Sequence, residues 1–290
     1  MTSIWRSLGN ALKQPKRPQF LIIGVQKAGT TTLYDLLNGY PQFCGSVDKE
    51  TGYFSNDDYY HQGKSWYARQ FKHCSRSAIG FEATPVYIYH PDAAQRIFAF
   101  NPNMKFIVIL REPAARCYSA WNMYRRFNES SAQQMYEQFI QHTNPPIKAA
   151  ISELLFTKNY PSFKQAVADD IDRYWSGCPD VEPSFVRRGI YVEQIAHYLR
   201  YFRLENFLFL EQSELNSPLG ILQKIALFLN VDIPLQQTDM PISSNVGDYL
   251  DNNAETQETL QLLRHFYQPH NEALFAQIGL RYDWNLGVTL

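Results

Sequence analysis

Hydrophobic positions along the chain fall into short unbroken runs and longer stretches with helical spacing. The first run, QFLIIGV at residues 19–25, is apolar after its glutamine, which is typical of a strand buried on both faces of a parallel sheet. Directly after it, Leu33, Leu36 and Leu37 form the apolar stripe of a helix. Threonines stand before this stripe where an N-cap belongs, and Gly39 closes it, so the pattern predicts a strand, a short loop and a helix.

The rest of the chain repeats this alternation. Further strands are expected at AIGFEATPVYIY, KFIVILREP and NFLFLEQSEL. Helices are expected at DAAQRIFAF, AARCYSAWNMYRRF, FKQAVADDIDRYW, VEQIAHYLRYF and ETLQLLRHFYQPHNEALFAQIG, and the stretch LGILQKIALFLNV follows the last strand. Strands that alternate with helices predict a three-layer α/β fold, in which helices cover both faces of a mainly parallel central sheet.

One domain over residues 19–290, preceded by a tail at 1–18, is the simplest division of the chain. Residues from 129 to about 180 interrupt the alternation with polar, proline-containing sequence, and we expect this insertion to form a rim or lid over the carboxyl edge of the sheet. The tail carries four cations beside apolar residues at helical spacing. A basic helix on a membrane surface and a short frayed terminus are both compatible with it, and the frayed terminus is our prediction.

Composition excludes several classes of protein. A chain of 290 residues with 45% hydrophobic and 19% charged residues is a globular, enzyme-sized protein and not a disordered one. Its 27 basic and 28 acidic residues leave a net charge of -1, so nothing in the balance calls for a nucleic-acid partner, and any anion site must be local. No apolar run approaches the roughly 20 residues that span a bilayer, and none forms a signal-peptide core. We therefore expect a cytoplasmic protein without a membrane span.

The cysteines predict neither a metal site nor a disulfide framework. Cys44, Cys74, Cys117 and Cys178 are scattered along the chain, with no CxxC pair and no cluster of cysteine and histidine in the sequence. We expect four reduced thiols and no bound metal.

The loop between the first strand and its helix has the composition of an anion site. The pattern GVQKAGTT places Gly24, Lys27 and Gly29 where unpaired amides and the positive end of the helix dipole meet. It differs from the ATPase motif GxxxxGK[ST], because Thr30 occupies the place of the lysine. The alternative is a tight turn that binds nothing.

A second anion feature follows the strand KFIVIL. Arg111 stands at the carboxyl end of this strand, where open sheets bind ligands, and Ser119 follows on the next helix. A guanidinium with a hydroxyl suits a terminal phosphate. The alternative is an arginine paired with Glu112 or Glu82.

Several blocks, taken together and in order, resemble those of a known family. They are FLIIGVQKAGTTTL, KETGYF, FEATPVYIY, NPNMKFIVILREPAARCYSAW, RRGIYVEQIAHYLRYF and HNEALFAQIGLRYDW. They look like the recurring blocks of sulfotransferases that use 3'-phosphoadenosine-5'-phosphosulfate (PAPS), above all the heparan sulfate N- and 3-O-sulfotransferase branch and its bacterial relatives. The likeness runs from about Phe20 to Trp284. It implies that the first loop is a P-loop-like 5'-phosphosulfate loop.

The resemblance also implies roles for individual residues in binding PAPS. Lys27 would hold the 5'-phosphate and stabilise the charge that develops on the bridging oxygen during in-line transfer. Arg111 and Ser119 would hold the 3'-phosphate, and Arg188 would assist, although Arg187 stands where the family usually has serine. The implied nucleotide-binding set is Gly24, Lys27, Ala28, Gly29, Thr30, Thr31, Thr32, Arg111, Ser119 and Arg188.

For the acceptor, the resemblance implies a general base. Glu50 in KETGYF matches the glutamate that removes the proton from the attacking hydroxyl or amine, which is worth roughly 100 to 10,000-fold in rate. A surface salt bridge is the alternative role for this glutamate, and His61 and His90 are rival bases. The acceptor pocket is expected to be lined by Tyr53, Trp66, Tyr87, Tyr89 and His90.

Two departures from the family weaken the link to heparan sulfate itself. Ala83 replaces a lysine that aids the leaving group in many relatives. The C-terminal cofactor loop, basic in the family, is SSNVGDY at residues 243–249 and has no cation. The acceptor is therefore predicted to be a hydroxyl or amine of either a small metabolite or natural product, or a glycan. The rival functions are a P-loop nucleotide kinase or hydrolase and a non-catalytic nucleotide-binding module, and the sequence leaves the oligomeric state open.

Overall fold

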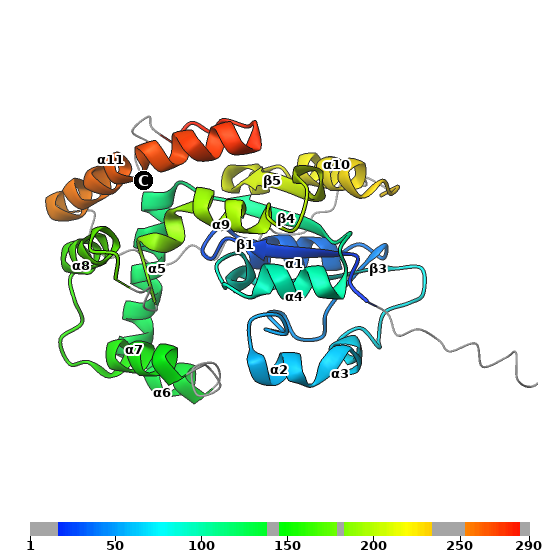
Figure 1. Ribbon diagram of the computed structural model, residues 1–290, viewed down its shortest axis with the longest axis horizontal. Helices are drawn as coiled ribbons and strands as arrows, with labels where there is room; N and C mark the ends of the chain where they lie inside the picture. Colours follow the sequence, from blue (N-terminus) through cyan, green and yellow to red (C-terminus); the bar gives the residue numbers. More distant parts are fainter. Residues whose placement is uncertain (1–16, 138–144, 179–182, 234–252, 285–290) are drawn as a thin grey trace, which may run out of the picture.

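Parallel strands form the central sheet of the computed structural model, which describes residues 17–137, 145–178, 183–233 and 253–284 (Figure 1). Within these residues the sheet has five strands in the order β2-β3-β1-β4-β5. The strands are β1 (Phe20–Gly24), β2 (Phe43–Gly45), β3 (Ile79–Ala83), β4 (Lys105–Leu110) and β5 (Phe207–Glu211). The predicted three-layer fold with a mainly parallel sheet is confirmed.

Strand β1 lies at the centre of the sheet and is buried along its whole length. It pairs in parallel with β3 on one side, where Phe20 lies opposite Phe81, and with β4 on the other, where Phe20 lies opposite Lys105. The chain builds β2 and β3 on one side of β1 and then crosses to β4 on the other. The carboxyl ends of β1 and β4 are thus the switch point at which open α/β sheets bind ligands.

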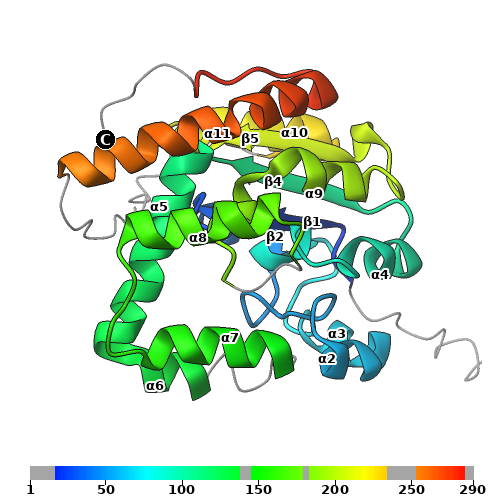
Figure 2. The same ribbon diagram turned by 60° about the vertical axis from the view of Figure 1, so that its left-hand side comes forward.

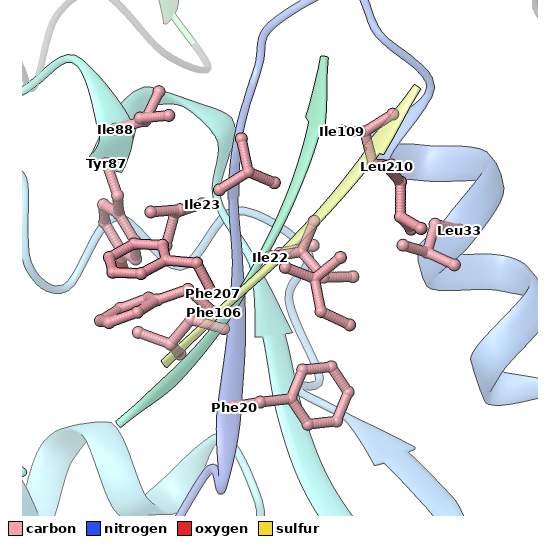
Figure 3. Packing of buried hydrophobic residues seen from close by; sticks show 14 of the residues in the cluster. Phe20, Ile22, Ile23, Leu33, Tyr87, Ile88, Phe106, Ile109, Phe207 and Leu210 are labelled. Atoms are coloured by element: carbon pink, nitrogen blue, oxygen red, sulfur yellow. The ribbon is translucent and has the colours of Figure 1, made fainter. Parts of the chain in front are cut away.

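Helices cover both faces of this sheet. Leu33 of α1 (Thr30–Asn38) packs beside Ile109 and Leu210 on one face (Figure 3). On the opposite face, Phe106 contacts Tyr198 of α9 (Tyr191–Tyr198), with ring centroids 5.5 Å apart. Side chains on both faces of a strand therefore pack against apolar residues of the helices. This is why the strands read as unbroken apolar runs in the sequence.

The helices that the periodicity predicts are present, with small differences at their ends. Besides α1 and α9 these are α4 (Ala93–Phe100), α5 (Pro113–Arg126), α8 (Phe163–Trp175) and α11 (Ala254–Ile278), and the stretch after β5 forms a further helix, α10 (Pro218–Leu229). The short helices α2 (Asp57–His61) and α3 (Gly63–Arg69) and strand β2 were not predicted, since segments of three to seven residues carry too little periodicity. The end of the expected strand AIGFEATPVYIY is instead the 3-10 helix η1 (Pro85–Ile88), which begins at the proline.

The expected insertion is mostly helical where it is described. It contains α6 (Ala132–Met135), α7 (Pro145–Phe156) and α8. Figure 2 shows α5 running from the sheet toward α6 and α7, and a second apolar cluster joins α5, α7, α8 and α11. The insertion thus packs on the helix that leaves the carboxyl end of β4; its role as a rim or lid stays a prediction. The tail up to residue 16 and the loop at 243–249 lie outside the described residues.

One prediction about the cysteines is wrong. Cys44 of β2 and Cys74, which follows α3, form a disulfide across a separation of 30 residues, with Cα atoms 5.7 Å apart. Of the other two, Cys117 is a buried free thiol and Cys178 an exposed one. The fold brings the edge strand beside the turn after α3, a proximity that spacing along the chain does not encode. In the described part of the chain, no helix is long and apolar enough to cross a membrane.

Candidate active site

The loop after β1 turns sharply into α1. Val25 continues the ladder by donating its amide to the Ile109 carbonyl at 2.8 Å. Lys27 then has a φ of 72° and Gly29, the N-cap of α1, a φ of 91°. The N-cap is therefore this glycine and not a threonine, which corrects the prediction; Thr30 is the first helical residue. The first amides of a helix have no intrahelical acceptor and lie at its positive end, so this turn presents donors for an anion.

At both glycines of the loop a side chain already stands where a Cβ would lie. A Cβ on Gly24 would lie 2.6 Å from Cγ2 of Ile88, and a Cβ on Gly29 would lie 2.3 Å from Cδ1 of Leu215. Figure 3 shows Ile88 among the buried side chains beside β1. Gly29 is further restricted by its left-handed backbone. Close approach of the protein to itself, in addition to any approach to a phosphate, thus explains this glycine pattern.

Arg111 connects the two predicted anion sites. Its Nη1 donates to the Lys27 carbonyl at 2.9 Å, and its own carbonyl accepts from the Tyr191 hydroxyl at 2.9 Å. The carboxylate of Glu112 instead accepts from the amides at the start of α5, at 3.0 and 2.7 Å. The carboxylate of Glu82 accepts from hydroxyl groups. The guanidinium therefore lies against the loop, as expected if both features serve one ligand.

Helix α5 brings further side chains toward Lys27. Ser119 is 5% exposed, and Met123 lies one turn later on the same face of the helix. The Lys27 ammonium contacts the Met123 sulfur at 3.7 Å. Lys27 is thus directed toward the helix face that carries Ser119, so residues after β1 and residues after β4 converge.

Arg188 is held in place by an aromatic ring. It lies in the 3-10 helix η4 (Arg187–Gly189), is 7% exposed, and stacks its guanidinium 4.4 Å from the ring centroid of Tyr89. The Tyr89 hydroxyl donates to Ser184 Oγ at 3.0 Å. Tyr89, predicted to face the acceptor, therefore positions a predicted nucleotide-binding arginine.

Glu50 lies at the carboxyl end of β3, next to β1. Its amide donates to the Ala83 carbonyl at 3.0 Å, its φ is 64°, and its side chain is 48% exposed. Its carboxylate forms an ion pair with Lys49, so the salt bridge weighed as an alternative role exists. Ala83 is fully buried, and its backbone supports Glu50. The fold thus places the predicted base one strand away from the Lys27 loop, exposed and beside a cation.

Two aromatic residues predicted to line the acceptor pocket belong to the core, which corrects that expectation. Tyr53 is 2% exposed and stacks on Tyr67 with centroids 4.4 Å apart. Tyr87 is fully buried and donates to Glu82 at 2.7 Å. Trp66 is partly exposed. Burial in the core stabilises an aromatic side chain more than exposure at the wall of a pocket does. The sequence does not show which of these two environments a tyrosine occupies.

The two rival histidine bases differ in surroundings. His61 is exposed at the end of α2. His90 is half-buried, and its Nδ1 accepts from the Asp92 amide at 3.2 Å. Burial lowers the pKa of His90 below its ordinary value. His90 stays the rival of Glu50 for the role of general base.

Three residues that contact the candidate site residues or their segments were not among the predicted ones. Tyr191 supports Arg111, Met123 contacts Lys27, and Glu82 forms the centre of a buried hydroxyl cluster. The tyrosine in RRGIY was a usable signal, because it belongs to a recognised block. The other two contacts join segments far apart in sequence and give no local pattern.

The known proteins that this chain resembles are sulfotransferases. Residues 17–254 match the family described as Sulfotransferase domain. Human heparan sulfate glucosamine 3-O-sulfotransferase 5 is 26% identical over 251 residues, which cover 83% of this chain and 64% of that protein. The human 3-O-sulfotransferase 6 is 26% identical over 287 residues, covering 92% of this chain and 73% of that protein. The chain thus spans less than two thirds of the first of these relatives.

A solved structure supports the fold. The crystal structure of a sulfotransferase from Alicyclobacillus acidocaldarius superposes with a TM-score of 0.65 at 21% identity, over 93% of this chain and 99% of that one. The match to the domain covers most of the chain, and the parallel sheet has the turn of Lys27 and the side chain of Arg111 together at its switch point. The protein belongs to the sulfotransferase family.

Proposed function

We propose that this protein transfers a sulfuryl group from PAPS to a hydroxyl or amine of an acceptor. The observation that carries the proposal is the 2.9 Å hydrogen bond from Arg111 to the Lys27 carbonyl. It joins the turn after β1 to the end of β4 at the switch point of the sheet. A donor with phosphate groups at two positions needs two anion sites in one crevice.

The donor groups present fit such a ligand. The set consists of the first amides of α1, the ammonium of Lys27, the guanidinium groups of Arg111 and Arg188, and the hydroxyl of Ser119. Amides at a helix start, guanidinium groups and hydroxyls are the groups that bind phosphate in proteins. PAPS, when bound, supplies an activated sulfuryl group whose departure leaves negative charge on the adjoining oxygen.

The chain's own residues supply the remaining chemistry. Lys27 stabilises the charge that develops on the leaving oxygen, a contribution specific to the transition state. Glu50 accepts the proton of the acceptor group and is exposed enough to reach it. Lys49, its ion-pair partner, adds a cation near the position where Ala83 lacks the family's lysine.

The relatives support a saccharide acceptor, because the proteins compared above are named for 3-O-sulfation of glucosamine in heparan sulfate. An anionic polysaccharide is less favoured by this chain, whose net charge is -1. We therefore propose an uncharged or amine-bearing saccharide, with a small metabolite or natural product as the second class of acceptor.

Nucleotide selectivity tests the donor assignment. We expect adenosine 3',5'-bisphosphate without magnesium to raise the melting temperature of the protein, since a ligand that binds only the folded state stabilises it. ATP with magnesium is the comparison. Stabilisation by ATP and magnesium alone would overturn the donor assignment in favour of a nucleotide kinase or hydrolase.

Turnover tests the catalytic roles. Transfer of labelled sulfate from PAPS is measured with two probes, a glucosamine-containing oligosaccharide and a small amino alcohol. Lys27→Ala and Glu50→Gln are expected to abolish transfer, and Glu50→Gln is expected to keep its affinity for the bisphosphate. Full transfer by Glu50→Gln would show that another group, His90 first among them, is the base.

A further inference from the structure

Glu82 is a buried carboxylate with an unusual number of hydroxyl partners. It is 0% exposed at the end of β3. Its Oε1 accepts from Thr51 at 2.6 Å, from Thr84 at 2.5 Å and from Tyr87 at 2.7 Å, and its Oε2 accepts from Tyr67. All four donors are themselves buried. A buried charge is costly unless hydrogen bonds compensate it, so this arrangement needs a reason beyond packing.

Two of these hydrogen bonds lead to the segment that carries Glu50. Thr51 is the next residue in the chain and donates directly to Glu82. The Tyr87 hydroxyl donates to Glu82 and also accepts from the amide of Phe54 at 3.2 Å. The carboxylate therefore holds residues 50–54 at both ends, directly at Thr51 and through Tyr87 at Phe54.

This attachment matters because the backbone at Glu50 is unfavourable by itself. A φ of 64° is left-handed, a conformation that residues other than glycine adopt uncommonly and at a cost in free energy. The neighbouring contacts impose it here: the Glu50 amide is held by the Ala83 carbonyl, and the adjoining threonine by Glu82.

We propose that Glu82 is a positioning residue for catalysis, which fixes the Glu50–Phe54 segment so that the Glu50 carboxylate is directed toward the acceptor. The proposal rests on the proposed function, because it takes Glu50 as the base. Glu82 itself does not contact the reacting atoms, since it is enclosed by hydroxyl groups in the core. Its effect is on the geometry of proton removal and not on nucleotide binding.

The two threonines that donate to the same oxygen offer a matched test. Thr51→Val removes the hydroxyl that joins Glu82 to the Glu50 segment, and Thr84→Val removes an equally buried hydroxyl outside that segment. Glu82→Gln keeps the size of the side chain but replaces one acceptor oxygen with a donor. Transfer from PAPS to the glucosamine-containing oligosaccharide gives kcat and KM. Hydrogen exchange of the peptide spanning residues 50–54, measured without any acceptor, reports how readily this segment opens.

Thr51→Val and Glu82→Gln are expected to lower kcat about tenfold or more, because a base misplaced by a fraction of an ångström loses much of its advantage. Both are expected to speed exchange in residues 50–54 about tenfold and to leave the KM for PAPS within about twofold. Thr84→Val is expected to stay within about threefold of the wild-type kcat. If Glu82→Gln does not fold, the comparison of Thr51→Val with Thr84→Val tests the proposal by itself.

Equal losses in the two threonine variants would overturn the proposal, since they would indicate a general role in stability. Unchanged kcat and exchange in Thr51→Val and Glu82→Gln, with an inactive Glu50→Gln, would also overturn it while leaving the proposed function intact. Wild-type kcat in Glu50→Gln would instead overturn the assignment of the base in the proposed function.

Discussion

Reduction of the Cys44–Cys74 disulfide should destabilise the protein by an amount that follows from the loop it closes. The bond joins residues 30 positions apart and encloses Glu50, α2 and α3. In the chain-entropy treatment, cross-linking a loop of this length removes about 12 cal/mol/K from the unfolded state, or about 3.6 kcal/mol at 25 °C. With an unfolding entropy of roughly 2.1 cal/mol/K per residue, a chain of this size should melt about 6 °C lower.

Calorimetry with and without a phosphine reductant measures this shift. The double variant Cys44→Ser/Cys74→Ser should melt at the lower temperature and no longer respond to reductant, because it lacks the bond. Cys178→Ser, which changes an exposed free thiol, should behave like the wild type. A reductant effect below about 1 °C, or one of the same size in the double variant, would refute the loop-closure reasoning.

Three further outcomes are expected. Gly29→Ala should lower the free energy of unfolding in urea by roughly 2–4 kcal/mol, because residue 29 has a φ of 91° and the added Cβ would collide with Leu215. Gly177→Ala, at a φ of 65° with no atom near the added Cβ, should lower it by only about 1 kcal/mol, and equal losses would contradict the packing argument. Arg111→Ala should weaken binding of adenosine 3',5'-bisphosphate by roughly 2–5 kcal/mol in calorimetric titration. Arg281→Ala, at an exposed arginine, is the control, and an unchanged affinity in Arg111→Ala would show that Arg111 does not belong to the site. Burial raises the pKa of Glu82 above its usual 4.5, so the folded state binds this proton more tightly than the unfolded state does. The associated stability is therefore lost as the pH rises from about 4.5 through the raised pKa. Unfolding at several pH values should show this decline in the wild type and not in Glu82→Gln, and parallel curves for the two proteins would count against it.

The aromatic residues show where prediction from sequence fails. Tyr53, Tyr87 and Tyr89 stand close together near the recognised blocks and were all expected to face an acceptor. The structure buries the first two and uses the third to hold Arg188. Whether a tyrosine lines a pocket or fills a core depends on which distant segments pack against it, and residue type does not encode this.

Local patterns alone determined the alternation of strands and helices, the turn after β1 and the place of Arg111 at the end of β4, because each depends on residues near in sequence and on the rule that parallel strands bring their carboxyl ends to one edge. The tertiary structure decided the disulfide, the side chains that occupy the space above both loop glycines, and the enclosure of Glu82 by hydroxyl groups. These contacts join segments tens of residues apart. Their free energy depends on burial, and burial is a property of the whole folded chain.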